Sequence, residues 1–179
     1  MGADKAFLEF GGQRLLVRAL SVAGAVCDSV MIVGDPAKFA EYATTVADII
    51  PGCGPLAGIH TALVSSSAEL NLMLAVDMPF ISRELLAFLF VEAEKSDATI
   101  TVPRTGKGLQ PLCAIYRRDF SAAAEAALRV GKYKIDAAFS GVPIRVIEES
   151  ELAATGFSEQ SFFNVNTPQD RLAADRQSP

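Results

Sequence analysis

The sequence predicts an α/β fold in which helices cover both faces of a mostly parallel sheet, a three-layer α/β/α sandwich. Short apolar runs alternate with segments of helical periodicity along most of the chain. This alternation is typical of parallel strands joined by right-handed helical crossovers. The chain has 179 residues, 50% of them hydrophobic and 21% charged, which is enough for one domain with its own core. We therefore expect residues 1–179 to form a single domain.

Charge and cysteine content narrow the function classes. The formal net charge is −5, which argues against nucleic acid or an anionic membrane as a partner. The three cysteines lie far apart and form no CxxC pair. Neither a zinc site nor a disulfide framework is indicated, and a cytoplasmic location is expected. No apolar run approaches the ~20 residues that a membrane-spanning helix needs.

Helices are predicted from apolar spacing and from residues typical of helix starts. Residues 14–26 carry apolar side chains at helical spacing. Pro36 is typical of a first helical turn, and Ser82 is typical of an N-cap. On these signals helices are expected at residues 14–26, 36–43, 82–95, 119–130 and 133–140, and after Pro168, and residues 54–65 are expected to form a loop that leads into a helix.

Strands are predicted where short apolar or β-branched runs fall between these helices. They are expected at residues 30–33, 46–50, 72–76, 99–102, 112–116 and 144–147.

Asp77 directly follows the run at residues 72–76, which has no polar side chain. Such a run is typical of a strand buried on both faces of a parallel sheet, and ligands bind beyond the carboxyl ends of such strands. A carboxylate there is a hard oxygen ligand suited to Mg²⁺ beside phosphate. The residues alone leave it equally open that Asp77 only caps the turn that Pro79 fixes.

A second candidate is the loop Gly54-Pro55-Leu56-Ala57-Gly58. Pro55 is suited to the first position of a helix, whose N-terminus attracts anions and polar ligand edges. Two glycines would let a base or a phosphate approach the backbone. Close packing of a helix on a sheet explains the same glycines equally well.

A third candidate is Asn164-Val165-Asn166, which precedes Thr167-Pro168-Gln169-Asp170. The second segment is explained by helix capping alone, with Thr167 as N-cap and Asp170 at the third helical position. The amide oxygens of Asn164 and Asn166 could complete a Mg²⁺ shell or hold a triphosphate. Turn formation, the usual role of asparagine, is the alternative.

Two basic segments are weaker candidates. Lys5 matters only if phosphates lie near it, because an ammonium group is a compact point charge for them. The polar loop at residues 104–111 contains Arg104, Lys107 and Gln110 and could cover an anionic substrate. A solvated surface loop is about equally compatible with its composition.

The order and spacing of these segments resemble those of the molybdenum cofactor guanylyltransferases of the MobA type, within the wider nucleotidyltransferase superfamily. The matching segments are Met1-Gly2-Ala3-Asp4-Lys5-Ala6, Gly54-Pro55-Leu56-Ala57-Gly58, Asp77-Met78-Pro79-Phe80, Gln110-Pro111-Leu112 and Asn164-Val165-Asn166-Thr167-Pro168. The resemblance implies a Rossmann-like nucleotidyltransferase fold. It also implies Mg²⁺-dependent transfer of GMP from GTP to the molybdopterin-bound molybdenum cofactor, with release of pyrophosphate. A molybdoenzyme or its chaperone would then receive the product.

The same resemblance suggests roles for residues. Lys5 would contact the nucleotide phosphates, and Asp77 would bind Mg²⁺ with GTP. Asp48 falls where the family has a nucleotide-contacting aspartate. Gly34 falls where the family has an asparagine, so its contact would be through the backbone or absent.

Further roles follow from the same comparison of motifs. Asn166 or Asn164 would help Asp77 to hold the metal. The loop from Arg104 to Gln110, including Lys107, would face the pterin phosphate together with Lys132 and Lys134.

The chain departs from the family pattern at its start. The family begins with a strand and a glycine-rich loop of the form L-A-G-G-x-x-x-R-M-G-x-D-K, whereas this chain opens at the Met-Gly of that pattern. We therefore expect an N-terminally truncated domain in which two strands lack a neighbour. The alternatives are a cytidylyltransferase acting on the same cofactor and a non-catalytic relative that binds nucleotide or cofactor.

Overall fold

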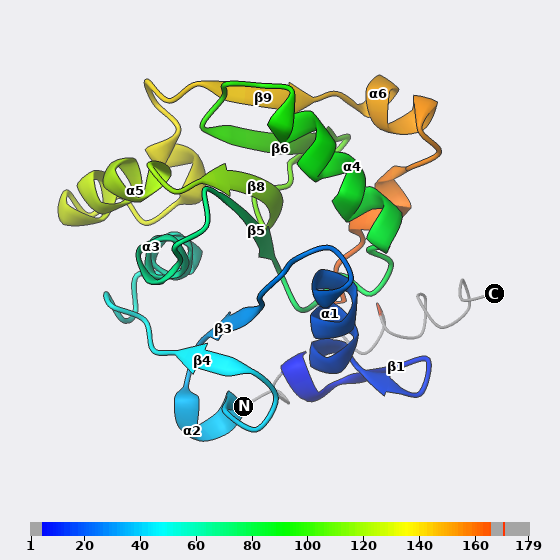
Figure 1. The fold of residues 1–179 in the computed structure, drawn as a ribbon, viewed down its shortest axis with the longest axis horizontal. Coiled ribbons are helices and arrows are strands. Elements are labelled where there is room, and N and C mark those ends of the chain that lie inside the picture. The colour runs from blue at the N-terminus through cyan, green and yellow to red at the C-terminus, as the bar shows by residue number, and fades with distance from the viewer. Residues whose placement is uncertain (1–4, 166–169, 171–179) are drawn as a thin grey trace.

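The computed structural model describes residues 5–165 and residue 170. Within them, helices cover both faces of a mixed sheet, which lies in the upper part of Figure 1. A smaller two-stranded unit and a hairpin lie below it. No helix in the described part of the chain is long and apolar enough to cross a membrane.

The helices are mostly short. The α-helices are α1 (Leu15–Gly24), α2 (Pro36–Phe39), α3 (Pro55–Ser65), α4 (Arg83–Glu94), α5 (Phe120–Arg129) and α6 (Glu149–Ala154). The described residues also form three 3₁₀-helices: η1 (Lys5–Phe7), η2 (Ile135–Ala138) and η3 (Glu159–Phe162). The predicted N-cap of α4 is confirmed, since the Ser82 hydroxyl accepts a hydrogen bond from the amide of Leu85 at 3.2 Å. The helix predicted at residues 133–140 forms only the single turn η2.

The strands form three separate sheets. They are β1 (Glu9–Phe10), β2 (Gln13–Arg14), β3 (Met31–Val33), β4 (Thr44–Val46), β5 (Leu70–Leu74), β6 (Ile100–Thr105), β7 (Gly108–Leu109), β8 (Cys113–Arg117) and β9 (Ile144–Ile147). The hairpin β1–β2 stands alone, and β3 pairs in parallel with β4. The largest sheet has the order β5-β8-β6-β7, with β9 also paired to β6.

The prediction of a mostly parallel sheet is wrong. In the largest sheet, β8 runs antiparallel to both β5 and β6, and only β9 is parallel to its neighbour β6. The reason is the length of the connection: residues 106–112 join β6 to β8, and a parallel crossover needs a dozen residues or more. The α/β class remains, but the sheet is mixed.

The strand before Asp77 also differs from its prediction. β5 spans Leu70–Leu74, so that Asp77 lies three residues beyond the strand in a turn. Of the five residues of β5, only Met73 is buried, whereas burial on both faces was expected. β5 is partly open because a groove adjoins it.

Two helix layers pack on the largest sheet. In β8, Ala114 and Tyr116 belong to the core beneath α3 and α5, whereas Cys113 and Ile115 belong to the core beneath α4 and α6. All four side chains are fully buried. This alternation is what a strand covered on both faces requires.

An apolar groove of about 600 Å³ separates β3 from β5. Its lining includes Ile32 on β3, Leu72 on β5 and Leu20 on α1. In the described residues β3 pairs with β4 and β5 pairs with β8, so each strand is paired along one edge only. The small β3–β4 unit is therefore attached to the rest of the molecule by helices and side chains rather than by a continuous sheet.

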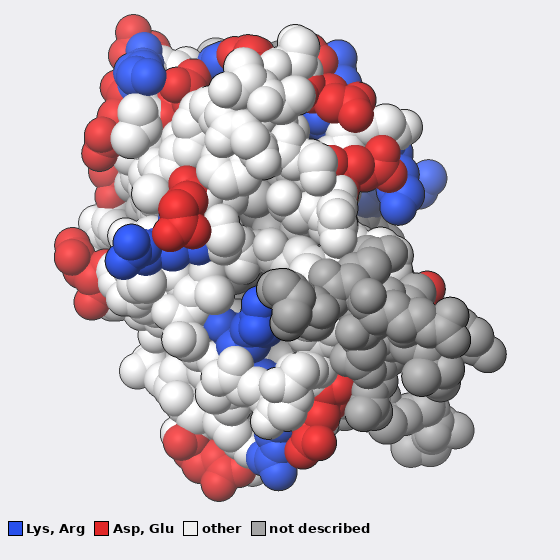
Figure 2. All heavy atoms as spheres, turned by 90° about the vertical axis from the view of Figure 1, so that its right-hand side faces the viewer, with Lys and Arg blue, Asp and Glu red and all other residues white. Residues whose placement is uncertain are grey.

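Charged side chains are unevenly spread on the surface. On the face shown in Figure 2, acidic side chains lie mostly toward the edges, and one group of basic side chains lies near the middle.

Candidate active site

Asp77 is held in place through its backbone. Its carbonyl oxygen accepts a hydrogen bond from the amide of Val165 at 2.8 Å, and the amide of Ala75, two residues earlier, donates to the carbonyl of Leu112 at 2.7 Å. The turn after β5 is thus fixed from two directions while the Asp77 side chain stays 17% exposed. A carboxylate positioned in this way can meet a ligand without rearrangement of the backbone.

Lys5 lies directly against this carboxylate. Its ammonium nitrogen, Nζ, is 3.2 Å from Oδ2 of Asp77, although 72 positions separate the two residues in the chain. Lys5 opens the 3₁₀-helix η1, and its side chain is 44% exposed. The two residues expected at the phosphates and at the metal are therefore brought together.

Asn164 contributes a buried polar atom next to the same turn. Its Oδ1 is buried and has no hydrogen-bond partner among the described residues. The residue that follows it, Val165, donates to the carbonyl of Asp77. Buried polar atoms in proteins almost always have a partner, and a bound cation or water would supply one for this oxygen. Asn166, the other predicted amide ligand, lies outside the described residues, as does the capping segment at residues 167–169.

The loop before α3 contains a backbone conformation that favours glycine, as expected from Gly54. Gly54 has φ 72° and ψ −164°, a conformation that side chains disfavour, and Pro55 is the first residue of the helix. Gly58 faces Asp48, because a Cβ atom added at Gly58 would lie 4.0 Å from Oδ1 of Asp48. Leu56 and Ala57, between these glycines, are buried in the core.

The groove connects this loop with the Lys5–Asp77 pair. Pro55 and Gly58 line it, as do Ala6 and Val76, the sequence neighbours of Lys5 and Asp77. Gly34 follows β3, and a Cβ atom there would lie 3.2 Å from the Phe39 ring. A larger residue would push that ring aside, and the position offers a ligand only backbone groups.

The residues expected at the pterin fall into two separate groups. Arg104 pairs with Glu148 at 3.1 Å, and Lys107 pairs with Glu159 at 3.2 Å. Lys132 and Lys134 instead line a cavity of about 880 Å³ beside the start of α3. The buried amide of Gln110 donates within its own turn, to Oγ1 of Thr105 at 3.0 Å and to the carbonyl of Gly108 at 3.2 Å.

An aromatic and cationic cluster near Lys5 was missed from the sequence. The rings of Phe7 and Phe39 stack with centroids 5.8 Å apart, and Tyr42 lies 6.0 Å from Phe7. Arg14 and Lys38 place their charged groups over Phe7, at 5.8 and 5.5 Å from its centroid. These residues come from η1, β2, α2 and the following turn, so no local sequence pattern could have revealed the cluster.

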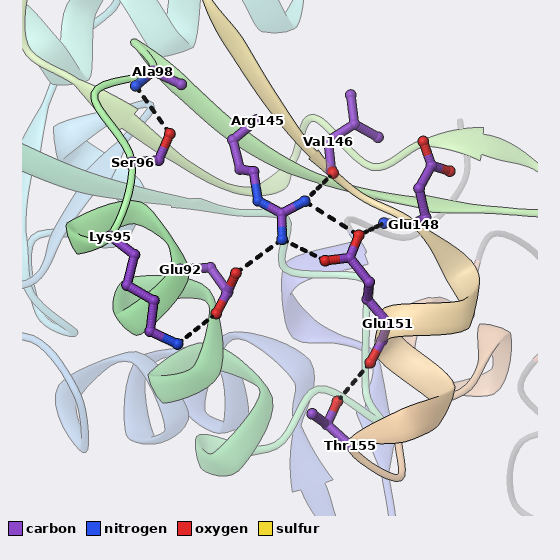
Figure 3. Close-up of polar contacts among 9 residues, drawn as sticks. All are labelled: Glu92, Lys95, Ser96, Ala98, Arg145, Val146, Glu148, Glu151 and Thr155. Atoms are coloured by element: carbon purple, nitrogen blue, oxygen red, sulfur yellow. Dashed lines mark hydrogen bonds and ion pairs between the residues drawn. The ribbon is translucent and has the colours of Figure 1, made fainter.

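A group of carboxylates away from Asp77 is already neutralised by ion pairs. Figure 3 shows Arg145 of β9 between Glu92 of α4 and Glu151 of α6. The Arg145 guanidinium lowers the pKa of Glu151 to about 2, mainly through their hydrogen bond. Lys95 and Arg145 lower the pKa of Glu92 in the same way. This network ties two helices to the sheet edge and leaves no carboxylate poised for a cation.

The described residues offer little for metal or thiol chemistry away from Asp77. In residues 5–165 and 170, no group of three or more His, Cys, Asp or Glu side chains is arranged to hold a metal. A cation at Asp77 would therefore depend on one carboxylate with amide and ligand oxygens. Burial raises the pKa of the Cys113 thiol to about 12, so this cysteine is not a thiolate nucleophile near neutral pH.

Comparison with known protein families shows the family to which this chain belongs. The model of the MobA-like NTP transferase domain matches residues 1–142. The chain belongs to this family. A "Probable molybdenum cofactor guanylyltransferase" of Pelotomaculum thermopropionicum is 38% identical over 176 residues, covering 97% of this chain and 85% of the relative. The "Molybdenum cofactor guanylyltransferase" of Desulfosudis oleivorans is 30% identical, covering 97% and 87%.

Solved structures agree with this membership of the MobA-like family. The crystal structure of "Molybdopterin-guanine dinucleotide biosynthesis protein A" from Archaeoglobus fulgidus matches with a TM-score of 0.85 and 27% identity, covering 98% of this chain and 91% of that one. A 2-C-methyl-D-erythritol 4-phosphate cytidylyltransferase from Thermus thermophilus matches with a TM-score of 0.71 at 23% identity, which shows the shared fold alone. The predicted family and nucleotidyltransferase-like fold are confirmed.

Proposed function

We propose that this chain transfers GMP from GTP to the molybdenum-bound molybdopterin cofactor and releases pyrophosphate. The observation that carries the proposal is the contact between Lys5 and Asp77, 3.2 Å apart, in a chain of the MobA-like family. One residue offers a carboxylate to a divalent cation, and the other offers an ammonium to phosphates. The names of the guanylyltransferase relatives support guanine as the base.

The donor set fits a hard divalent cation, which we take to be Mg²⁺. Asp77 would bind it through its carboxylate, and Asn164 would bind it through the buried oxygen that has no described partner. Asn166 would be a further ligand. When bound, such an ion supplies charge stabilisation to the phosphates of the nucleotide.

The chain's own residues would mainly position the reactants, because phosphoryl-type transfers depend on orientation and charge. Lys5 exchanges its partner Asp77 for the nucleotide phosphates. The backbone of Gly34, the side chain of Asp48 and the start of α3 at Gly54–Gly58 would form the walls of the nucleotide pocket. The open groove beside this loop leaves room for the base to enter.

The acceptor cofactor would approach from the second cavity. Pro55 lines both this cavity and the groove, so both spaces adjoin the start of α3. Lys132 and Lys134 would hold the acceptor's phosphate there. Arg104, Lys107 and Gln110 would act from the neighbouring loop, and the product would pass to a molybdoenzyme or its chaperone in the cytoplasm.

The test is a product assay with nucleotides labelled at the α-phosphate. The chain, Mg²⁺ and molybdenum-loaded molybdopterin are incubated with labelled GTP or with labelled CTP. We expect label from GTP in a dinucleotide cofactor and an equal amount of pyrophosphate. Label from CTP would favour the cytidylyltransferase, and nucleotide binding without either product would favour a non-catalytic relative.

A further inference from the structure

The arginines of this protein are held in two different ways. Several are neutralised by carboxylates at 2.6 to 3.1 Å, among them Arg104, Arg117 and Arg129. Arg14 and Arg18 have no carboxylate partner among the described residues. Instead, aromatic rings and neutral oxygens hold them, so each keeps its full positive charge.

Specific contacts fix the orientation of both guanidinium groups. The Arg14 guanidinium carbon lies 5.8 Å from the Phe7 centroid, and its Nη1 donates to the Tyr42 hydroxyl at 2.6 Å. The Arg18 guanidinium carbon lies 5.7 Å from the Phe10 centroid, and its Nε donates to the carbonyl of Pro79. A cation over a ring is fixed in direction without being neutralised.

These contacts tie the two arginines to the segments that carry Lys5 and Asp77. Phe7, beneath Arg14, lies two residues after Lys5 in η1, and Pro79, bonded by Arg18, lies two residues after Asp77. Arg14 is the last residue of β2 and the N-cap of α1, and Arg18 lies in the first turn of that helix. Lys5 thus contacts the carboxylate directly, and both arginines are held against segments close to it in the chain, in a protein whose formal net charge is −5.

Two guanidinium groups beside an ammonium suit an anion that carries several charged oxygens. Guanidinium presents paired N–H donors that match phosphate oxygens, and it stays charged at any physiological pH. The contacts described above use one N–H of each arginine, which leaves other donors for a ligand. A diphosphate fits this arrangement better than a single carboxylate would.

We propose that Arg14 and Arg18 bind the pyrophosphate that leaves GTP, an assignment that rests on the proposed function. In that step an oxygen of the acceptor phosphate forms a bond to the α-phosphorus, and the bond from the α-phosphorus to the bridging β-oxygen breaks. The electron pair stays on the leaving oxygen, so one negative charge develops on pyrophosphate. Arg14 and Arg18 stabilise this charge, while Lys5 remains at the reacting phosphate.

The experiment is calorimetric titration with magnesium pyrophosphate, without GTP or cofactor. Arg14→Gln and Arg18→Gln are compared with the intact chain and with Arg129→Gln, a surface control whose partner Glu125 lies on α5. We expect affinity to fall about tenfold for each substitution, because a hydrogen bond to a charged group contributes a factor of this order. The control should bind as the intact chain does, and Arg18→Lys should recover part of the loss, since it restores charge without the planar fork.

A second readout separates ligand binding from a structural role. Product inhibition by pyrophosphate should weaken in the Gln variants, with melting temperatures close to that of the intact chain. If Arg18→Gln does not fold, Arg14→Gln and Arg18→Lys carry the test. Equal pyrophosphate affinity in folded variants, or the same loss in Arg129→Gln, would overturn the inference.

The outcomes also distinguish this inference from the function on which it rests. Binding of pyrophosphate that depends on Arg14 and Arg18, in a chain that makes no dinucleotide product, would uphold the anion site and reject guanylyl transfer. Normal dinucleotide formation with unchanged pyrophosphate affinity, in a variant that combines Arg14→Gln with Arg18→Gln, would uphold the transfer and reject the anion site.

Discussion

The strands of the sheet β5-β8-β6-β9 are paired and buried more completely than those of the unit β3–β4. In the larger sheet, β8 is paired on both edges and Ile115 is fully buried. In the smaller unit, β3 is paired on one edge, and Ile32 lines an apolar groove of about 600 Å³. Dense packing stabilises the first region, whereas the second leaves room beside the candidate nucleotide pocket.

The contacts of charged residues also differ between these two regions. At the edge of the larger sheet, Arg145 is neutralised by Glu92 and Glu151, which fixes α4 and α6 in place (Figure 3). Near Lys5, Arg14 and Arg18 keep their charge over aromatic rings. Ion pairs thus join elements in one region, whereas in the other the two arginines have no carboxylate partner among the described residues. This difference separates the part of the molecule that maintains the fold from the part that we expect to bind nucleotide.

The largest expected effect is that of Asp77→Ala on turnover. Loss of the carboxylate should lower the rate of GTP-dependent product formation about a thousandfold, because charge stabilisation by a bound metal is worth several kcal/mol. Stability should change by less than about 1 kcal/mol, since the ion pair with Lys5 is partly exposed and the backbone bond to Val165 remains. Product assays and thermal melts of Asp77→Ala and of Asp97→Ala, an exposed control, measure both effects. Normal turnover in Asp77→Ala would exclude its metal role.

A matched pair of substitutions tests the difference in packing. Ile115→Ala in β8 should cost about 2–5 kcal/mol of unfolding free energy, because it opens a cavity in a closed core. Ile32→Ala in β3 should cost about 1 kcal/mol, since its side chain is partly exposed beside an existing groove. Urea unfolding of both variants gives the comparison. Equal costs would show that β3 is packed as tightly as β8.

The smallest effect concerns the dependence of stability on pH. The folded pKa of Glu151 is lowered from 4.5 to about 2, so this carboxylate stabilises the fold above about pH 4.5 and loses that effect as the pH falls toward 2. Glu151→Gln should therefore be less stable than the intact chain at neutral pH, and the gap should close between pH 4.5 and 2. Urea midpoints across this range measure the gap, with Glu149→Gln as a control on the same helix. A gap that stays constant with pH would contradict the account of this network.

Local signals predicted the helices better than the sheet. The N-cap at Ser82 and the proline at the start of α3 are effects of neighbouring residues, so both helix starts followed from the sequence. The direction of β8 depends on a seven-residue connection whose hairpin geometry the apolar pattern does not encode. The hairpin β1–β2 was missed because its strands have two residues each, around Gly11 and Gly12.

The sequence indicated which residues to consider for the candidate site, but not which of them contact one another. The motif around Asp77 and the charge of Lys5 were visible in the sequence, whereas their contact joins residues 72 positions apart. Arg14 and Arg18 gave no signal, because the rings that orient them come from other elements. The roles of Lys5, Asp77, Asn164, Asp48 and the loop at Gly54 stay predictions.

The most direct test of the account is to locate a paramagnetic divalent ion bound with nucleotide. Mn²⁺ is added with GTP to the isotopically labelled protein, and the broadening of backbone amide signals is measured by NMR. We predict strong broadening at Asp77 and Val165 and sharp signals at Glu92, Arg145 and Glu151, where ion pairs already neutralise the carboxylates. Broadening centred on Glu92 and Glu151, or its persistence at Val165 in Asp77→Asn, would contradict the assignment of nucleotide chemistry to the turn after β5.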